Sequence, residues 1–173
     1  MLRSNLPIIR IPGDGRCMFR SVVYGACLRT GDPPPSLTRQ KELADELRAK
    51  VVDEFIKRRA DTEWFLEGDF NTYTVQMRRS QAWGGEPELL MSSHVLQLSQ
   101  FSFAKHSYVT NIHYFFNHDL SYGFRMPITV IMHDTNSNNL KIIAEYGQEY
   151  GKEKPIRVIY DGFGHYDVFK CST

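Results

Sequence analysis

Hydrophobic residues recur at helical spacing through the first half of the chain. Across residues 17–28 they follow a period close to that of an α-helix, which predicts a helix there. A second helix is predicted after Ser36, because serine caps helix N-termini and the apolar residues that follow recur every four positions. Those residues are Leu43, Leu47, Val51 and Phe55. Two acidic, aromatic-rich segments, 61–67 and 69–77, precede a third predicted helix from Pro87 to about residue 97.

The last third of the chain changes to short runs of β-branched and aromatic residues separated by turn residues, which is typical of strands. The runs are 128–132, 140–143, 156–160 and 166–169. One earlier extended run, 8–11, is closed by the turn-rich sequence Pro12-Gly13-Asp14-Gly15. An early strand, then helices, then strands predicts an α+β domain: a small central β-sheet flanked by helices.

Length and composition are those of one globular domain covering residues 1–173. Hydrophobic residues make up 42% of the chain and charged residues 24%, which is enough apolar surface for a core. The apolar runs are far shorter than the roughly 20 residues that span a bilayer. The formal net charge of +1 gives no reason to expect binding to nucleic acid or to an anionic membrane. We expect a monomer with neither partner.

Cysteine content indicates a reducing compartment. The three cysteines are odd in number and lack CxxC spacing, which argues against a disulfide framework or a thiolate zinc site. They are Cys17, Cys27 and Cys171. Polar residues interrupt the first twelve positions, so we expect no signal peptide there. These observations favour a cytoplasmic and/or nuclear location, where a free thiol can serve as a catalyst.

Cys17 lies between a predicted strand and the start of a predicted helix. A helix N-terminus favours the thiolate, the reactive form of cysteine, through aligned peptide dipoles and unpaired amides. The amides of Gly15, Arg16 and Cys17 are also candidates to stabilise a developing oxyanion. Taken alone, Cys17 is better interpreted as a buried core cysteine, which is what most free cysteines are. Cys27, in the apolar middle of the same predicted helix, keeps that structural interpretation.

A second candidate group lies in the sequence Gly162-Phe163-Gly164-His165-Tyr166-Asp167. His165 enters a predicted strand after a glycine-bearing loop, and an imidazole near a thiol supplies the base that forms the thiolate. Asp167 is two residues further on, so in a strand it shares a face with His165 and can orient the ring. Taken alone, His165 is better interpreted as a surface histidine in a turn. The other five histidines lack this context, and no metal site is predicted.

Three motifs together resemble those of the ovarian-tumour (OTU) deubiquitinases, with the closest likeness to plant members. The first is Asp14-Gly15-Arg16-Cys17-Met18-Phe19-Arg20-Ser21. The second is Trp83-Gly84-Gly85 followed by Glu88-Leu89, and the third is Gly164-His165-Tyr166-Asp167. They occur in the order that the family has, and the resemblance covers residues 8–169 with one interruption.

The resemblance implies a papain-like cysteine protease fold and a deubiquitinase activity, the hydrolysis of isopeptide bonds after the C-terminal glycine of ubiquitin. It implies that Cys17 is the nucleophile and His165 the general base. Asp14 belongs to the active site of the family, where it orders the cysteine loop. Asp167 matches the position that orients the histidine. Which of Asp14 and Asp167 contributes more stays open, and the spacing favours Asp167.

The same resemblance implies a narrow substrate channel bordered by Trp83, Gly84 and Gly85. Gly15 and Arg16 lie beside the nucleophile at its inner end. The implied partner is ubiquitin or polyubiquitin chains, and thiol proteolysis needs neither a metal nor an organic cofactor. Two other functions remain open: a catalytically impaired ubiquitin-binding OTU module, and a thiol protease for another ubiquitin-like modifier.

One segment, 98–125, departs from the family pattern. It is rich in aromatic residues, histidine, serine and asparagine, and it has no clear periodicity. Removing it joins residue 97 to Met126 in a sequence like that of the family. We interpret it as an insertion, either an in-frame retained intron or an ordinary surface loop.

Overall fold

The structure, a computed structural model, describes residues 7–96, 125–134, 139–152 and 154–170. Most helices precede most strands along the chain. The elements of the first half are β1 (Ile8–Ile9), α1 (Cys17–Thr30), α2 (Leu37–Lys57), α3 (Arg59–Thr62), the 3-10 helix η1 (Glu63–Phe65), α4 (Phe70–Met77) and α5 (Glu86–Val95). The elements of the second half are β2 (Ile128–His133), β3 (Leu140–Tyr146), the 3-10 helix η5 (Gln148–Tyr150), β4 (Ile156–Tyr160) and β5 (Tyr166–Phe169).

The strands form one sheet with the order β1-β5-β4-β2-β3. Strand β2 pairs with β4 in parallel, and the other neighbours are antiparallel. The two-residue strand β1 therefore joins the beginning of the chain to β5 at its end. This mixed sheet with helices packed on it confirms the α+β prediction.

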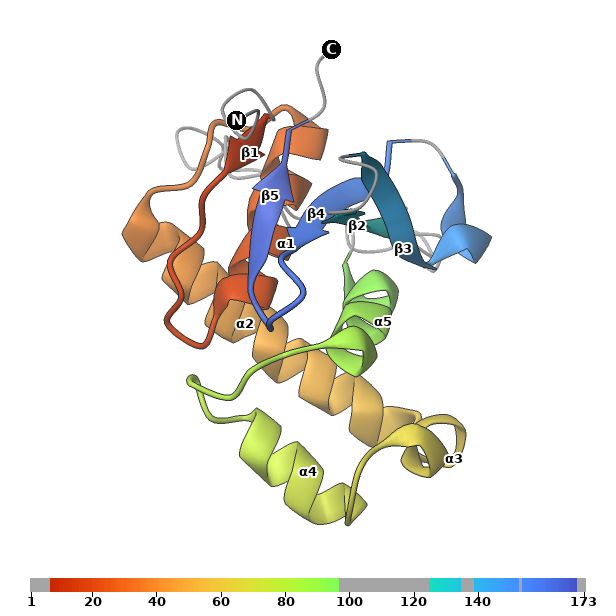
Figure 1. Cartoon of the computed structure of the whole chain (residues 1–173). Coiled ribbons are helices and arrows are strands. Elements are labelled where there is room, and N and C mark those ends of the chain that lie inside the picture. The colour runs from red at the N-terminus through yellow and green to blue at the C-terminus, as the bar shows by residue number, and fades with distance from the viewer. Residues whose placement is uncertain (1–6, 97–124, 135–138, 153, 171–173) are drawn as a thin grey trace, which may run out of the picture.

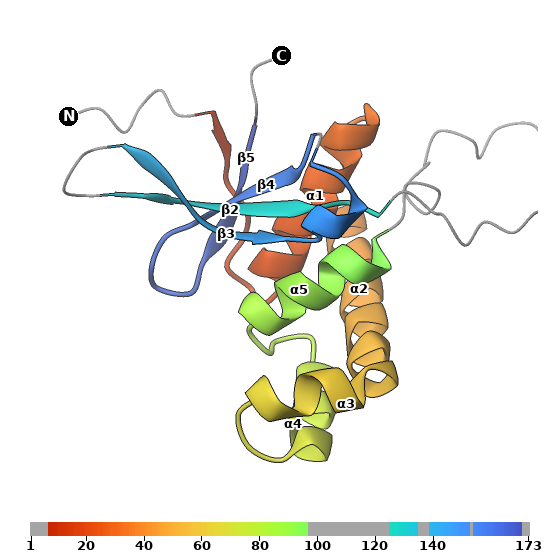
Figure 2. The ribbon, with the colours of Figure 1, turned by 90° about the vertical axis from the view of Figure 1, so that its right-hand side faces the viewer.

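Helices α1 and α5 lie against the sheet, and α2 packs behind them (Figure 1). Helices α3 and α4 form an arm on the side away from the sheet, as both views show (Figure 2). Helix α1 approaches β4 closely, because a Cβ built on Gly25 would lie 2.7 Å from Cγ2 of Ile156. A glycine weakens a helix interior, but here it permits this close packing.

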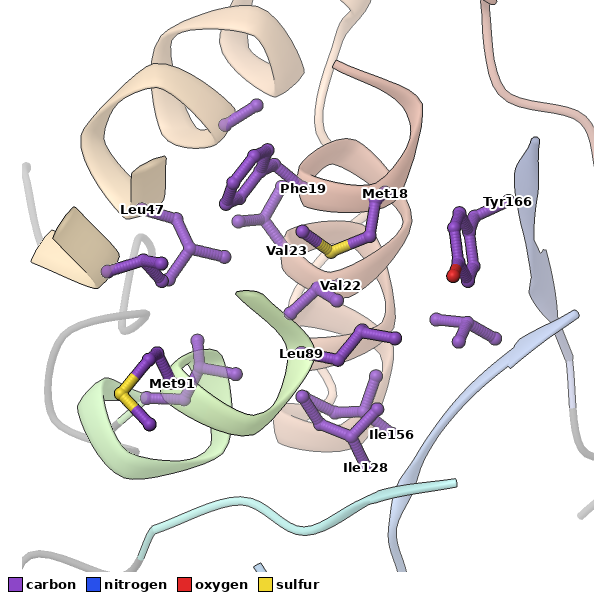
Figure 3. Packing of buried hydrophobic residues seen from close by; sticks show 14 of the residues in the cluster. Met18, Phe19, Val22, Val23, Leu47, Leu89, Met91, Ile128, Ile156 and Tyr166 are labelled. Carbon is purple, nitrogen blue, oxygen red and sulfur yellow. The ribbon is translucent and has the colours of Figure 1, made fainter. Parts of the chain in front are cut away.

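The core lies between α1, α2, α5 and the sheet. The buried face of α1 presents Met18, Phe19 and Val22, each at most 1% exposed. Leu89 of α5 and Ile156 of β4 pack on the same cluster (Figure 3). Because α1 is buried along most of its length, its first residue, Cys17, has little freedom to move.

The helix boundaries follow the predicted caps. The side chain of Ser36 accepts a hydrogen bond from the Arg39 amide, which confirms Ser36 as the N-cap of α2. The predicted helix from Pro87 to about residue 97 is observed as α5, with Gly85 as its N-cap and Glu86 as its first residue. Within the described ranges, no helix is long and apolar enough to cross a membrane. The predicted insertion at 98–125 lies outside the described residues, apart from Arg125, as does Cys171.

Arg48 of α2 is the largest fully buried side chain among the described residues, and it holds two loops together. Its guanidinium donates to the carbonyls of Met77, Ala82 and Ser80, at 3.2, 2.8 and 3.1 Å. It also donates to the carbonyl of Gly15 at 3.0 Å. A buried cation is tolerated where several acceptors surround it. Arg48 therefore fixes the loop before Cys17 relative to the loop before Trp83.

We predict that Arg48→Met destabilises the protein by about 2–4 kcal/mol, because it leaves several carbonyls without their buried donor. Urea unfolding monitored by circular dichroism measures this change. Arg39→Ala is the matched control, since the pair of Arg39 with Glu42 is solvent-exposed and such pairs contribute little. Equal unfolding midpoints for Arg48→Met and the control would contradict the role given to Arg48.

Candidate active site

Cys17 is the first residue of α1 and follows a loop whose shape depends on Gly15. Gly15 has φ +79°, a conformation that residues with a Cβ rarely adopt. A Cβ on Gly15 would also lie 2.6 Å from the carbonyl oxygen of Gln81. Gly15 thus lets the cysteine loop pack against the backbone of residues 77–82. From the sequence, a close approach of the substrate to Gly15 had been an alternative reason for this glycine. The result is that Cys17 is half-buried at the start of a helix whose following residues are buried.

His165 lies at the end of the loop that joins β4 to β5, and Asp161 shapes this loop. The carboxylate Oδ1 of Asp161 accepts from the amides of Phe163 and His165, at 2.8 and 3.0 Å. Gly164 has φ +105°, so the chain turns just before the histidine. These bonds fix the backbone of His165, and with it the direction of the imidazole.

Asp167 holds the ring of His165. Its Oδ1 lies 3.1 Å from Nε2 of His165 and accepts from the amide of Ile11 at 2.7 Å. Its Oδ2 accepts from Arg10 at 2.6 Å. Only 4% of the Asp167 side chain is exposed, so these donors replace the water that the carboxylate has lost. The two-residue spacing predicted that His165 and Asp167 share one face of a strand, and their contact agrees with that prediction.

The thiol and the histidine loop meet, although 147 residues separate them in the chain. The Sγ of Cys17 lies 3.8 Å from the carbonyl oxygen of Gly164, the residue before His165. Among the described residues, the thiol forms its side-chain hydrogen bond with this carbonyl and not with the imidazole. The other ring nitrogen, Nδ1, faces Gly13, whose added Cβ would lie 3.7 Å away. The sulfur and the imidazole thus lie in one site, but they do not form a hydrogen bond with each other.

Asp14 contacts the cysteine loop rather than the histidine. Its Oδ1 accepts from the amide of Arg16 at 3.1 Å, and its Oδ2 accepts from Arg20 at 2.6 Å. Arg16 in turn donates to Asp45 of α2 at 2.7 Å. Asp14 therefore orders the loop before Cys17, and Asp167 is the carboxylate on the imidazole. The amide of Arg16 is occupied by Asp14, which leaves it unavailable to an oxyanion in this arrangement.

The segment Trp83-Gly84-Gly85 borders the same site. The Trp83 side chain is 69% exposed, and its ring packs so closely on Gly164 that an added Cβ would lie 2.5 Å from it. A Cβ on Gly84 would lie 2.5 Å from Cε of Met18, so this glycine packs against the start of α1. Gly85 donates its amide to Oε2 of Glu88 at 2.8 Å. Trp83 thus lies next to the histidine loop and Gly84 next to α1, whereas Gly85 is the N-cap of α5.

A hollow of about 210 Å³ lies between the N-terminus of α5 and the sheet. Gly85 and Glu86 form one wall, and Tyr146, Tyr160 and Tyr166 form much of the other. Tyr166 directly follows His165 in the chain, and its backbone amide contacts the Cys17 thiol. The hollow is therefore adjacent to the reactive residues.

The charged residue that lines the hollow is an acid, Glu86. Burial, and then the charge of Glu86, raise the pKa of Tyr146 to about 12. Burial also raises the pKa of Tyr166, and Glu86 contributes to that rise. No lysine or arginine of the described chain lines the hollow.

The electrostatic surroundings of Cys17 oppose its ionisation. Burial raises the pKa of the Cys17 thiol, and the carboxylates of Asp14 and Asp161 raise it further. The backbone amides of Tyr166 and Met18 act in the opposite direction but are outweighed. The sequence had favoured the thiolate through the helix N-terminus, so burial is the larger effect. The thiol is therefore protonated at neutral pH until a base removes its proton.

Three residues of the site were not identified from the sequence: Arg10, Arg48 and Asp161. Asp161 had a signal, because it begins an Asp-Gly turn in front of the histidine loop. Arg48 had a weaker signal, as a charged residue within the apolar stripe of α2. Within the described residues, no group of three or more histidine, cysteine or acidic side chains is placed to hold a metal ion.

We predict that Asp161→Asn lowers the pH at which Cys17 becomes reactive. The change removes a negative charge that raises the pKa of the thiol, while the amide oxygen of asparagine can still accept from the loop. The rate of Cys17 alkylation by iodoacetamide is followed across pH by peptide mass spectrometry, and the pH of half-maximal rate is the midpoint. Asp53→Asn, on the exposed face of α2, is the control. If the alkylation midpoint of Asp161→Asn equals that of the control or rises, Asp161 does not raise the pKa of the Cys17 thiol.

Comparison with known proteins places this geometry in a family. Residues 12–99, about half of the chain, match the family described as OTU-like cysteine protease. The chain is 55% identical to the OVARIAN TUMOR DOMAIN-containing deubiquitinating enzyme 4 of Arabidopsis thaliana over 165 residues, which is 95% of the chain and 43% of that protein. It is 27% identical to enzyme 3 of the same series from Arabidopsis thaliana, over 93% of the chain and 66% of that protein. The chain thus spans less than half of the first relative.

Solved structures agree on the fold. The OTUD1 OTU domain has a TM-score of 0.59 and 20% identity, with 93% of this chain and 83% of that chain covered. The Hazara virus OTU bound to ubiquitin has a TM-score of 0.59 and 17% identity, with 96% and 82% covered. The OTU/papain-like fold expected from the motifs is thereby confirmed. By its matched sequence, its three motifs and its fold, the chain belongs to the OTU-like cysteine protease family.

Proposed function

We propose that the protein is a thiol-dependent deubiquitinase that hydrolyses isopeptide bonds after the C-terminal glycine of ubiquitin. One observation carries the proposal: the Cys17 thiol contacts the backbone beside His165, and Asp167 holds the imidazole at 3.1 Å. The relatives named as deubiquitinating enzymes support the activity. OTU domains solved in complex with ubiquitin support the substrate.

His165 acts as the general base. The Asp167 carboxylate accepts a hydrogen bond, so it selects the tautomer with the proton on Nε2 and leaves Nδ1 as the acceptor. The thiol first turns from the Gly164 carbonyl toward Nδ1 and transfers its proton there. Such a change is common, because catalytic hydrogen bonds often tighten only when substrate binds.

The thiolate of Cys17 then attacks the carbonyl carbon of the terminal glycine. A carbon–sulfur bond forms, the carbon–nitrogen bond breaks, and the imidazolium of His165 gives its proton to the departing lysine amine. Water, deprotonated by the same imidazole, hydrolyses the thioester and releases ubiquitin with a free carboxylate. The amides of Gly15 and Cys17 are the backbone donors proposed for the oxyanion, since that of Arg16 is engaged.

The hollow beside Tyr166 receives the extended tail of the substrate, upstream of the glycine pair. Tyrosine rings and the Glu86 carboxylate, with no lining cation, suit a tail residue with a cationic side chain. Trp83 packs over Gly164 and narrows the path to the thiol, which favours glycines at the reacting end.

A second candidate function is a catalytically impaired ubiquitin-binding OTU module. The raised pKa of Cys17 and the bond of its thiol to Gly164 favour this alternative, because the nucleophile is not yet paired with its base. The proposed insertion at 98–125 bears on it too, because it lies just before β2 in the chain. A thiol protease for another ubiquitin-like modifier is the remaining alternative, because the triad does not determine which modifier is bound.

A ubiquitin probe with a thiol-reactive C-terminus tests the function. We predict a covalent adduct on Cys17, seen by gel shift and intact mass, that Cys17→Ala abolishes. His165→Ala should lower turnover of a ubiquitin–aminocoumarin substrate by about 10²–10⁴-fold, the usual contribution of a general base.

Cys27→Ser is the matched control, because Cys27 is buried in the same helix and takes no part in the proposed chemistry. It should still form the adduct. Tight ubiquitin binding without an adduct would support the impaired module instead. Reaction only with probes made from other modifiers would support the third function.

We predict that Glu86→Gln lowers kcat/KM by about two- to fivefold for peptide–aminocoumarin substrates that end in Arg-Gly-Gly, the range expected for one exposed ion pair. Substrates that end in Ala-Gly-Gly should show no such loss. Glu145→Gln is the control, since Glu145 is exposed on β3 but does not line the hollow. If both peptides respond equally to Glu86→Gln, the hollow does not select a cationic side chain.

A further inference from the structure

Arg10 lies opposite Asp167 because of the register between β1 and β5. In this antiparallel pair Ile8 faces Phe169 and Ile9 faces Val168. The next position along each strand therefore sets Arg10 against Asp167. The side chains meet accordingly, with the guanidinium nitrogen 2.6 Å from Oδ2.

The two oxygens of Asp167 have different partners. Oδ1 faces the imidazole of His165 and the amide of Ile11, whereas Oδ2 accepts from Arg10. The carboxylate is almost fully buried, but the Arg10 side chain is 77% exposed. A buried carboxylate needs donors on both oxygens to keep its charge and orientation. Arg10 supplies the donor on the oxygen that the histidine does not use.

We propose that Arg10 is a positioning residue for the histidine of the active site, acting through Asp167. By holding Oδ2, Arg10 fixes the rotation of the carboxylate and keeps Oδ1 directed at Nε2 of His165. The ring is thereby held with Nδ1 toward the site. The inference deepens the proposed function and rests on it, because positioning matters only where His165 serves as a base.

The charges around the pair determine how loss of Arg10 affects the pH profile. Asp167 and Asp161 are the carboxylates that face His165, and the Cys17 thiol, itself near Asp14, lies across the site. Arg10 is the cation on Asp167 and offsets part of its charge. Without Arg10, the negative charge of Asp167 is less neutralised, so Asp167 stabilises the imidazolium form of His165 more strongly. The acid limb of the activity profile should therefore move to higher pH.

The experiment compares Arg10→Ala and Arg10→Lys with the wild-type protein and with Arg39→Ala, another arginine in an ion pair but on an exposed helix face. Two rates are measured between about pH 5 and about pH 9, a range that brackets the titration of histidine. One is hydrolysis of ubiquitin–aminocoumarin, resolved into kcat and KM. The other is alkylation of Cys17 by iodoacetamide, which needs no ubiquitin. Urea unfolding of each variant accompanies both.

We expect Arg10→Ala to lower kcat by about three- to tenfold with little change in KM, the pattern of an interaction that acts in the chemical step. Its acid limb should move to higher pH in both assays, and Arg10→Lys should restore much of the rate. A purely structural role would instead lower the unfolding midpoint and leave the acid limb in place. That result, or equal rates for Arg10→Ala and Arg39→Ala, would overturn the proposal.

The two hypotheses fail in different ways. If the wild-type protein does not hydrolyse the ubiquitin substrate, the proposed function fails, while the alkylation profile of Arg10→Ala still shows whether Arg10 positions His165. If hydrolysis is present and Arg10→Ala matches the wild-type protein in both assays, only the positioning role fails.

Discussion

The packing of α1 against β4 and β5 is the interaction on which the site depends. Ser21, fully buried, donates to the carbonyl of Tyr166 at 2.8 Å and so joins α1 directly to β5. Gly25 lets the same helix approach Ile156 of β4. Because Cys17 begins α1 and His165 immediately precedes β5, the contact between these elements sets the position of the thiol relative to the imidazole. The apolar face of α1 thus contributes both to stability and to the geometry of the reaction.

Two separate charged networks hold the two halves of the site. On the cysteine side, Arg48 binds the Gly15 carbonyl and Asp14 binds the amide of Arg16. On the histidine side, Asp161 fixes the loop and Asp167 fixes the ring. The assignment of Asp14 to the first network and Asp167 to the second explains how two acids can both belong to one site with different tasks. Neither network fixes a hydrogen bond between the sulfur and the imidazole, since the thiol contacts the Gly164 carbonyl.

The sequence contained most of the fold and the main reactive groups, because these depend on local patterns. Helical spacing predicted α1 and α2, and the period of a strand correctly placed Asp167 beside His165. Arg10 was missed, because its partner is defined by the register of a two-residue strand that no local pattern encodes. Arg48 was missed for a similar reason: its acceptors are carbonyls of distant loops, and a carbonyl has no sequence signature. The extent of thiol burial also required the structure, and it reversed the expectation drawn from the helix N-terminus.

The protonation state of the Cys17 thiol determines when the proposed nucleophile can form. A thiolate formed in advance would be reactive toward any electrophile, whereas a buried thiol with nearby carboxylates stays protonated until a base is aligned with it. The Sγ of Cys17 donates to the Gly164 carbonyl, and Asp167 orients the imidazole of His165. In the proposed deubiquitinase, alignment of the thiol with Nδ1 of His165 therefore has to precede formation of the nucleophile, because the thiol contacts the Gly164 carbonyl instead.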